Sequence, residues 1–177
     1  EIIQPFANQF IMLVSNSNEK KTALARFVNY TKPLTRVYDN IDVWSVKPRN
    51  KEQNFSLNLL MDPTVSVVTL IGKAGSGKTL MAIAAGLEQI IGDRKDIYRR
   101  LIVSRPIQPM GKDLGYLPGT LEEKMAPWLA PIQDNLEYLM GNDKLTLAAY
   151  VQEGTIEIEA LTYIRGRSIS NAYIVID

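Results

Sequence analysis

The chain has 177 residues, of which 46% are hydrophobic and 22% charged, and its formal net charge is +1. This length and composition are typical of a globular protein with one domain and a real core, and the small net charge excludes a global basic field for nucleic acid. The absence of cysteine and histidine excludes disulfide frameworks, thiol chemistry, Ser-His triads and most zinc sites.

Membrane insertion and secretion find no support in the sequence. No apolar run approaches the length of a membrane span, and the N-terminal residues lack the pattern of a signal peptide. The absence of cysteine fits a reducing compartment. We therefore expect a cytoplasmic protein.

Residues 1–45 differ from the rest and predict a small β-rich segment. A turn cluster follows the first apolar run, and residues 22–30 fit either a strand or a helix. Such a segment is too short for an independent core, so it should pack either against the domain of residues 46–177 or against a part of the protein that precedes it. The predicted strands are 10–14, 35–38 and 41–44.

The main domain begins with a predicted helix. Asn50 can cap this helix, and Gln53 stands three residues later as its capping-box partner. The Gln53 amide could alternatively recognise the two-sided hydrogen-bonding edge of adenine. Spacing alone favours the cap.

The most specific motif is Gly72–Thr79, which fits G-x-x-x-x-G-K-[ST] at every specified position. Before it, Ser66–Ile71 is an apolar, β-branched run that predicts a buried strand. After it, Leu80–Ile91 carries its larger apolar residues at helical spacing. Strand, glycine loop and helix are in the order of a phosphate-binding P-loop; the alternative is a glycine-rich turn that matches by chance.

The residue types of the loop suit a polyphosphate. Glycines permit a tight turn and a close approach of backbone N–H groups, and the following helix points its positive dipole end at the anion. Lys78 can bring a positive charge to the β- and γ-phosphates, and Thr79 can offer a hydroxyl to Mg²⁺. The candidate nucleotide-binding residues are Gln53, Gly72, Lys73, Ala74, Gly75, Ser76, Gly77, Lys78, Thr79 and Leu80.

A second strand is predicted at Leu101–Ser104. It should be parallel to the strand before the P-loop, because a helix connects them. Arg105 then lies at the carboxyl end of the strand, where ligands of such sheets bind. It could contact a phosphate or form a salt bridge, and spacing does not decide between them.

The next part combines a long loop with helices. Residues 107–119 are rich in proline and glycine, and so long a loop in a compact domain is typically functional. A capping box at Thr120 opens a helix that Pro127 and Pro131 should break or restart. A short helix should run from Asp143 to Gly154.

Residues 155–160 alternate in polarity and predict a strand whose glutamates face solvent rather than act as catalytic carboxylates. The following segment, 163–168, is basic and contains Arg165 and Arg167. It is either a solvated turn or a clamp on phosphate, from a nucleotide or from nucleic acid.

The last residues, Asn171–Asp177, form an apolar strand that ends in an aspartate, the Walker B pattern. Asp177 should lie near the P-loop and help to hold Mg²⁺ through its water shell, so Lys78, Thr79 and Asp177 are the candidate catalytic residues. A catalytic glutamate, a sensor residue or an arginine finger would lie beyond residue 177. We expect the chain to be a fragment, truncated at Walker B.

Several further motifs resemble one family, the PhoH family of P-loop ATPases. Together with the P-loop they cover nearly all of residues 46–177. The series RP, LGYLPG and RGR is far more specific than the P-loop alone. The matching segments are 49–53, 72–79, 82–88, 104–106, 114–119, 123–125, 163–167 and 174–177.

This resemblance implies an α/β fold with a parallel sheet flanked by helices, like RecA and the motor core of superfamily 1 helicases. It implies ATP and Mg²⁺ as cofactors, Gln53 as the adenine reader and Arg105 near the nucleotide or the nucleic-acid path. In the family, Asp177 would be followed by Glu-Ala-Gln, which this chain lacks.

Residues 1–45 resemble the β-rich connector of members that carry a PIN ribonuclease domain upstream. That implies a longer parent protein that uses ATP to unwind and cleave RNA, as a ring of identical subunits, with single-stranded RNA as a partner. Two other readings remain open: a nucleotide-gated RNA-binding module with little turnover, and a P-loop kinase. Gln53 and the long insertion after Arg105 argue against the kinase.

Overall fold

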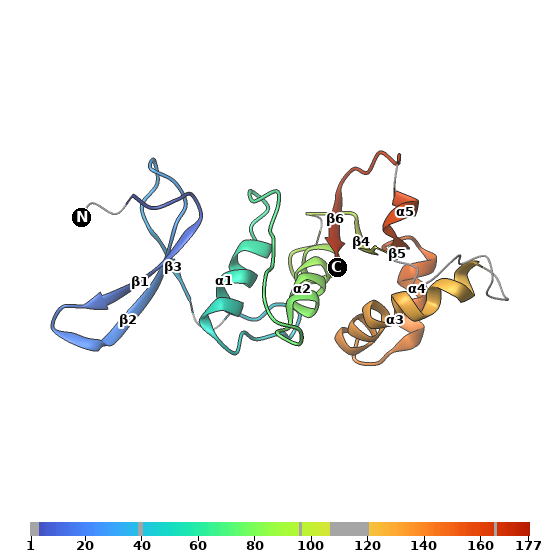
Figure 1. Cartoon of the computed structure of the whole chain (residues 1–177), viewed down its shortest axis with the longest axis horizontal. Coiled ribbons are helices and arrows are strands. Elements are labelled where there is room, and N and C mark those ends of the chain that lie inside the picture. The colour runs from blue at the N-terminus through green and yellow to red at the C-terminus, as the bar shows by residue number, and fades with distance from the viewer. Residues whose placement is uncertain (1–3, 39–40, 96, 107–120, 165) are drawn as a thin grey trace.

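The protein has an α/β architecture, as the sequence predicts, with two separate sheets. Figure 1 shows an elongated molecule: the N-terminal sheet lies at one end, α1 and α2 in the middle, and the second sheet with α3 and α4 beyond them. The computed structural model describes residues 4–38, 41–95, 97–106, 121–164 and 166–177.

The N-terminal sheet is antiparallel, with strands β1 (Gln9–Ser15), β2 (Asn18–Phe27) and β3 (Thr35–Val37) in that order. The predicted strands 10–14 and 35–38 are confirmed, and the ambiguous run 22–30 is largely strand.

The predicted strand 41–44 is wrong. Val43 and Val46 form an isolated bridge around a tight turn, in which Trp44 and Ser45 have positive φ angles of 51° and 62°. Both residues leave the β region, so the chain reverses where a strand would continue. The β-branched and aromatic residues of this run serve packing instead, since Val43 is fully buried against α1 and α2.

Helix α1 (Lys51–Leu60) carries the N-terminal sheet. The ring of Phe55 stacks on Phe10 of β1 with centroids 4.3 Å apart. At the end of the helix, Arg26 Nη1 lies 2.8 Å from Asp62 Oδ2, and the Arg26 side chain is almost entirely buried. The sheet therefore packs on one side of α1 through an aromatic stack and an ion pair.

The second sheet is parallel, with β4 (Arg100–Arg105) between β5 (Ile156–Ala160) and β6 (Ala172–Ile176). Val103 is paired with Val175 on one side and with Ile158 on the other, so these three residues share a face. The confirmed strands at 101–104, 155–160 and 171–177 place their carboxyl ends at one edge.

Helix α2 (Lys78–Ile90) packs on that face over β4 and β6, and α3 (Leu121–Leu139) packs beside it over β4 and β5. The predicted helix at 80–91 is confirmed. Gly86 is the point of closest approach: an added Cβ would lie 2.7 Å from Leu101 Cδ1 and 3.0 Å from Tyr173 Cδ1. Only glycine lets α2 sit this close to the sheet.

The prediction that Pro127 and Pro131 break or restart the helix is wrong, because both prolines lie inside the continuous helix α3. Four residues apart, they share one side of the helix, and both are exposed. Each proline lacks the N–H group that would bond to the carbonyl four residues before it, so Pro131 leaves the carbonyl of Pro127 without a helical donor, and on this exposed side solvent can take its place. Ile132 and Leu136 anchor the opposite side in the core.

The predicted buried strand at Ser66–Ile71 is also wrong. The segment forms no β ladder within the described residues, and Val67 and Ile71 are 81% and 93% exposed. A cavity of about 590 Å³ separates it from β6. An apolar, β-branched pattern indicates only that a segment can form a strand, and it does so only where a partner strand lies next to it.

The remaining elements are short. Helix α4 (Lys144–Gln152), capped by Asp143, is confirmed, whereas α5 (Leu161–Ile164) falls in the segment expected to be a basic loop. The predicted functional loop 107–119 lies outside the described residues. No helix in the described part of the chain is long and apolar enough to span a membrane.

We predict that Gly86→Ala destabilises the fold. The added methyl group overlaps with buried Leu101, and such overpacking typically costs about 1–3 kcal/mol, only partly offset by the better helix propensity of alanine, about 1 kcal/mol. Urea unfolding measures the change. In a Leu101→Val background, which removes the contacting Cδ1, the same substitution should cost less; an equal cost in both backgrounds would contradict the packing argument.

A second prediction concerns pH. Burial raises the pKa of Asp62, but hydrogen bonds from Thr64 and Arg26 outweigh it and hold the pKa below its usual value. The unfolded chain, with a pKa of about 3.9, therefore binds more protons near that pH, and the stability that Asp62 contributes is lost as the pH falls below about 5.

Asp62→Asn should accordingly cost about 1–3 kcal/mol of unfolding free energy at pH 7 and less at pH 3, where part of the contribution of the charged carboxylate is already lost. Urea unfolding of both proteins at the two pH values gives the comparison. If the difference in unfolding free energy between the two proteins is the same at both pH values, the charge of Asp62 does not contribute to stability.

Candidate functional site

The phosphate-binding loop leads directly into α2. Gly75 and Gly77 have φ angles of 74° and 82°, the left-handed region that favours glycine. The Lys78 ammonium group turns back into the loop and donates to the carbonyl oxygens of Gly72 (3.0 Å) and Lys73 (2.8 Å). The Lys78 charge thus lies within the loop, next to the first N–H groups of α2, an arrangement that favours an anion.

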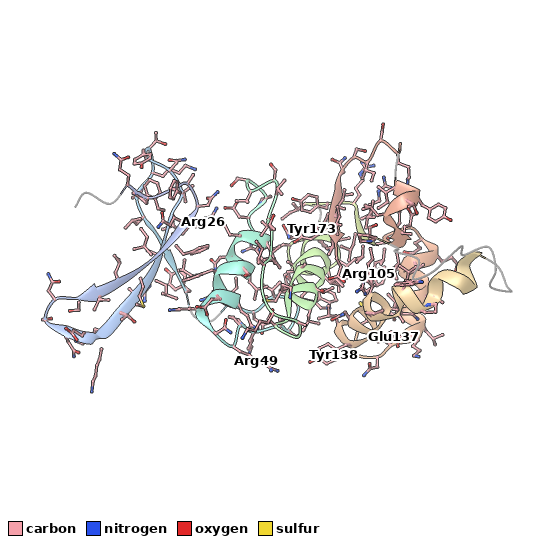
Figure 2. All side chains as sticks on the ribbon, viewed as in Figure 1. Arg26, Arg49, Arg105, Glu137, Tyr138 and Tyr173 are labelled. Atoms are coloured by element: carbon pink, nitrogen blue, oxygen red, sulfur yellow. The ribbon has the colours of Figure 1, made fainter. Side chains whose placement is uncertain are left out.

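Three side chains meet beside the loop, at the start of α2. The Thr79 hydroxyl donates a hydrogen bond to the Asp177 carboxylate, which spans 98 positions of the sequence. Arg105 Nε lies 3.9 Å from the other carboxylate oxygen of Asp177. Because Val103 pairs with Val175, Arg105 and Asp177 extend the same face of the sheet, the face that α2 covers. The salt bridge and the position near a phosphate, left open for Arg105 by the sequence, are both compatible with this place (Figure 2).

Gln53 lies on the other side of the loop. Its backbone N–H donates to Asn50 Oδ1 (2.8 Å), so the predicted cap is confirmed. Its side chain does not complete the capping box, however: Oε1 accepts from the Arg49 N–H (2.7 Å) and Nε2 donates to the carbonyl of Ser76 (3.2 Å). The amide therefore joins the start of α1 to the P-loop.

The Gln53 amide retains hydrogen-bonding capacity. Its oxygen has a second lone pair and its nitrogen a second hydrogen beyond the two bonds just described. One donor and one acceptor are thus available together, which is the complement of an adenine edge.

Two cavities flank the loop. One, of about 590 Å³, is bordered by Lys78, Thr79 and Asp177. The other, of about 840 Å³, is bordered by Gln53, the loop residues 75–77 and the end of α3. A nucleotide with its phosphates on the loop would extend into one of these two spaces.

Arg167 lies elsewhere. Its guanidinium donates to Glu159 (2.7 Å) and Glu157 (3.0 Å), and these hydrogen bonds raise the pKa of Arg167. Both glutamates occupy the face of β5 opposite to the one that α2 covers. The structure therefore separates Arg167 from the P-loop side, and Arg165 lies outside the described residues.

The donor set suits Mg²⁺. Thr79 and Asp177 offer a hydroxyl and a carboxylate oxygen, the ligand type that this ion prefers. No group of three or more His, Cys, Asp or Glu side chains in the described residues could hold a metal ion by itself. The other ligands would therefore be phosphate oxygens and water, as is usual for Mg²⁺ with a nucleotide.

Sequence reasoning missed the residues that border the larger cavity opposite Gln53. These are Trp44 and, at the end of α3, Tyr138 and Asn142. Gly141 is a typical helix-ending residue and indicates where α3 stops. No local sequence pattern, however, indicates that this helix end lies near Gln53.

Comparison with known proteins agrees with the motifs. A family model described as PhoH-like protein matches residues 45–177. Protein PhoH2 of Bacillus subtilis (strain 168) is 45% identical over 175 residues, which is 97% of this chain and 39% of that protein.

Two further relatives are also named protein PhoH2: that of Mycolicibacterium smegmatis is 40% identical over 156 residues, and that of Thermobispora bispora is 37% identical over 157 residues. Each alignment covers 88% of this chain and 35% of the relative, so the chain spans well under half of the proteins it matches. On the extent of the family match and on these identities, the chain belongs to the PhoH-like family, whose domain is a P-loop NTPase.

Proposed function

We propose that this chain is the ATP-binding and ATP-hydrolysing part of a protein that couples ATP turnover to RNA unwinding and processing. The observation that carries the proposal is the meeting of Thr79 and Asp177 beside the Lys78 loop, at the start of α2. It supports nucleotide hydrolysis because phosphoryl transfer needs positioned cations and oxygen ligands more than a special base, so the lack of histidine is no obstacle.

In this proposal the backbone N–H groups of residues 72–77 bind the phosphate chain, and Lys78 releases the loop carbonyls to pair with the β- and γ-phosphates. Thr79 and, through water, Asp177 would hold Mg²⁺, which would supply positive charge against the phosphates. Arg105, next to Asp177, is placed to stabilise charge on the γ-phosphate or to bind the RNA strand.

We assign the recognition of the adenine base to Gln53. Its spare donor and acceptor match N7 and the N6 amino group of adenine, and guanine presents an acceptor where adenine presents that amino group. The bonds to Arg49 and Ser76 support this role because they fix the amide plane relative to the loop.

The RNA part of the proposal rests on the resemblance to superfamily 1 motors and on residues 1–45. Single-stranded RNA would contact Arg105, and it would contact Arg165 and Arg167 once Arg167 releases Glu157 and Glu159. An upstream PIN ribonuclease domain would supply cleavage, and the full protein would work as a cytoplasmic ring. In support of a larger machine, the PhoH2 relatives are more than twice as long as the part that this chain matches.

We predict that the natural full-length protein hydrolyses ATP and that single-stranded RNA accelerates the reaction. Lys78→Ala should lower turnover about 100-fold or more, because it removes the positive charge that would stabilise the negative charge developing on the phosphates in the transition state. Steady-state ATPase assays with and without RNA test this. Lys144→Ala, an exposed lysine on α4, is the matched control and should leave turnover unchanged.

Tight ATP binding without turnover, with or without RNA, would reject the motor and leave a nucleotide-gated RNA-binding module. Turnover that RNA does not affect would retain the ATPase and reject its coupling to RNA.

Base selectivity provides a separate prediction. The protein should prefer ATP to GTP by about tenfold or more, and Gln53→Ala should remove most of this preference while binding of inorganic tripolyphosphate persists. Competition binding against a fluorescent ATP analogue measures the ratio. Gln53→Glu, which can still accept the Arg49 N–H but cannot donate, should lose the preference as well; an unchanged ratio in both variants would exclude Gln53 as the base reader.

A further inference from the structure

One side of the larger cavity beside the P-loop is formed by residues that are distant in the sequence from every motif residue. On the near side lie Gln53 and the loop residues 75–77; on the far side lie Tyr138 and Asn142 at the end of α3. Its volume of about 840 Å³ falls in the range of small-molecule sites, about 300–1,000 Å³.

The position of the polar groups decides which cavity takes the base. The smaller cavity is lined by Thr79 and Asp177, whose oxygen atoms suit the metal ion. A base directed there would displace that ion. On the larger cavity, the Gln53 amide offers a donor and an acceptor close to Gly77, whose added Cβ would lie 3.5 Å from Gln53 Nε2. The base therefore belongs in the larger cavity.

Tyr138 stands on the rim of this cavity with its side chain 65% exposed. Figure 2 shows Tyr138 and Arg49 along the same lower edge of the molecule, from α3 and from the segment before α1. The Tyr138 carbonyl accepts from the Gly141 N–H (3.1 Å), so the backbone that carries the ring is fixed at the helix end. An exposed aromatic ring beside a cavity of this size offers a stacking surface for a base.

Trp44 holds this helix end in place. Its indole Nε1 donates to the carbonyl of Leu139 (2.7 Å), one of the last carbonyls of α3, and its backbone N–H donates to Glu88 of α2 (3.1 Å). The residue adopts a positive φ of 51°, a strained conformation for a bulky side chain, and thereby bridges α2 and α3 next to the cavity.

We propose that Tyr138 stacks on the nucleobase of the bound nucleoside triphosphate, opposite Gln53, and that Trp44 is the positioning residue that fixes Tyr138 there. This inference rests on the proposed nucleotide binding at the P-loop and adds the second wall of the base site. It also predicts that stacking favours any base over none, whereas Gln53 selects among bases.

The test compares two ligands that share phosphates and differ in the base: ATP and inorganic tripolyphosphate, each titrated calorimetrically into the natural full-length protein. Tyr138→Ala should raise the dissociation constant for ATP about tenfold and leave that for tripolyphosphate unchanged. Tyr138→Phe, which keeps the ring, should bind ATP like the unmodified protein. Tyr30→Ala, another exposed tyrosine (72%), remote in the N-terminal segment, is the control.

Trp44→Phe removes the bond to the Leu139 carbonyl and should weaken ATP binding but not tripolyphosphate binding. If Trp44 acts only through Tyr138, the double variant with Tyr138→Ala should bind ATP no more weakly than Tyr138→Ala alone. A merely structural role would weaken both ligands. Additive losses would overturn the positioning role.

Equal ATP affinity of Tyr138→Ala and Tyr30→Ala, with tripolyphosphate still bound, would overturn the stacking proposal alone. Failure of the unmodified protein to bind either ligand, or binding that survives Lys78→Ala unchanged, would instead reject the proposed P-loop function. Thermal unfolding of each variant excludes loss of fold as the cause.

Discussion

The close packing of α2 on β4 and β6 is the constraint on which the whole site depends. Gly86 allows the helix axis to approach the sheet, because any side chain there would meet buried Leu101 and Tyr173. The same helix starts at Lys78, and the same strand β6 leads to Asp177. A shift of the helix away from the sheet would therefore separate Thr79 from Asp177 and turn the loop away from the strand ends. Packing in the middle of the domain thus determines chemistry at its edge.

Helix α1 belongs to two parts of the molecule at once. Its first turn places Gln53 against the P-loop, and its other residues hold the N-terminal sheet through the stack of Phe55 on Phe10. Its end is tied to α2 as well, since buried Gln89 donates to the carbonyl of Leu60 (3.1 Å). The same helix thus contacts the N-terminal sheet, the P-loop and α2.

Features that local chemistry determines could be predicted from the sequence. The P-loop, the cap at Asn50 and the strand before Asp177 each need particular residues at fixed spacing, and the structure contains all three. The errors arise where a distant partner decides. Residues 66–71 have strand propensity but no ladder in the described part of the chain, and α3 continues through Pro127 because the proline faces solvent while the opposite side is anchored. Neither the missing partner nor the anchoring can be read from a window of sequence.

The same distinction divides the site itself. The proposed phosphate and metal side is built from one contiguous loop and one strand end, so a short motif is sufficient to specify it. The proposed base side is assembled from a turn at Trp44, the start of α1 and the end of α3, which come together only in the folded chain. Substitutions on the base side can therefore alter which nucleotide is held without disturbing the groups that contact its phosphates. If Tyr138 and Gln53 act as proposed, nucleotide selectivity in this fold is a property that can change independently of hydrolysis.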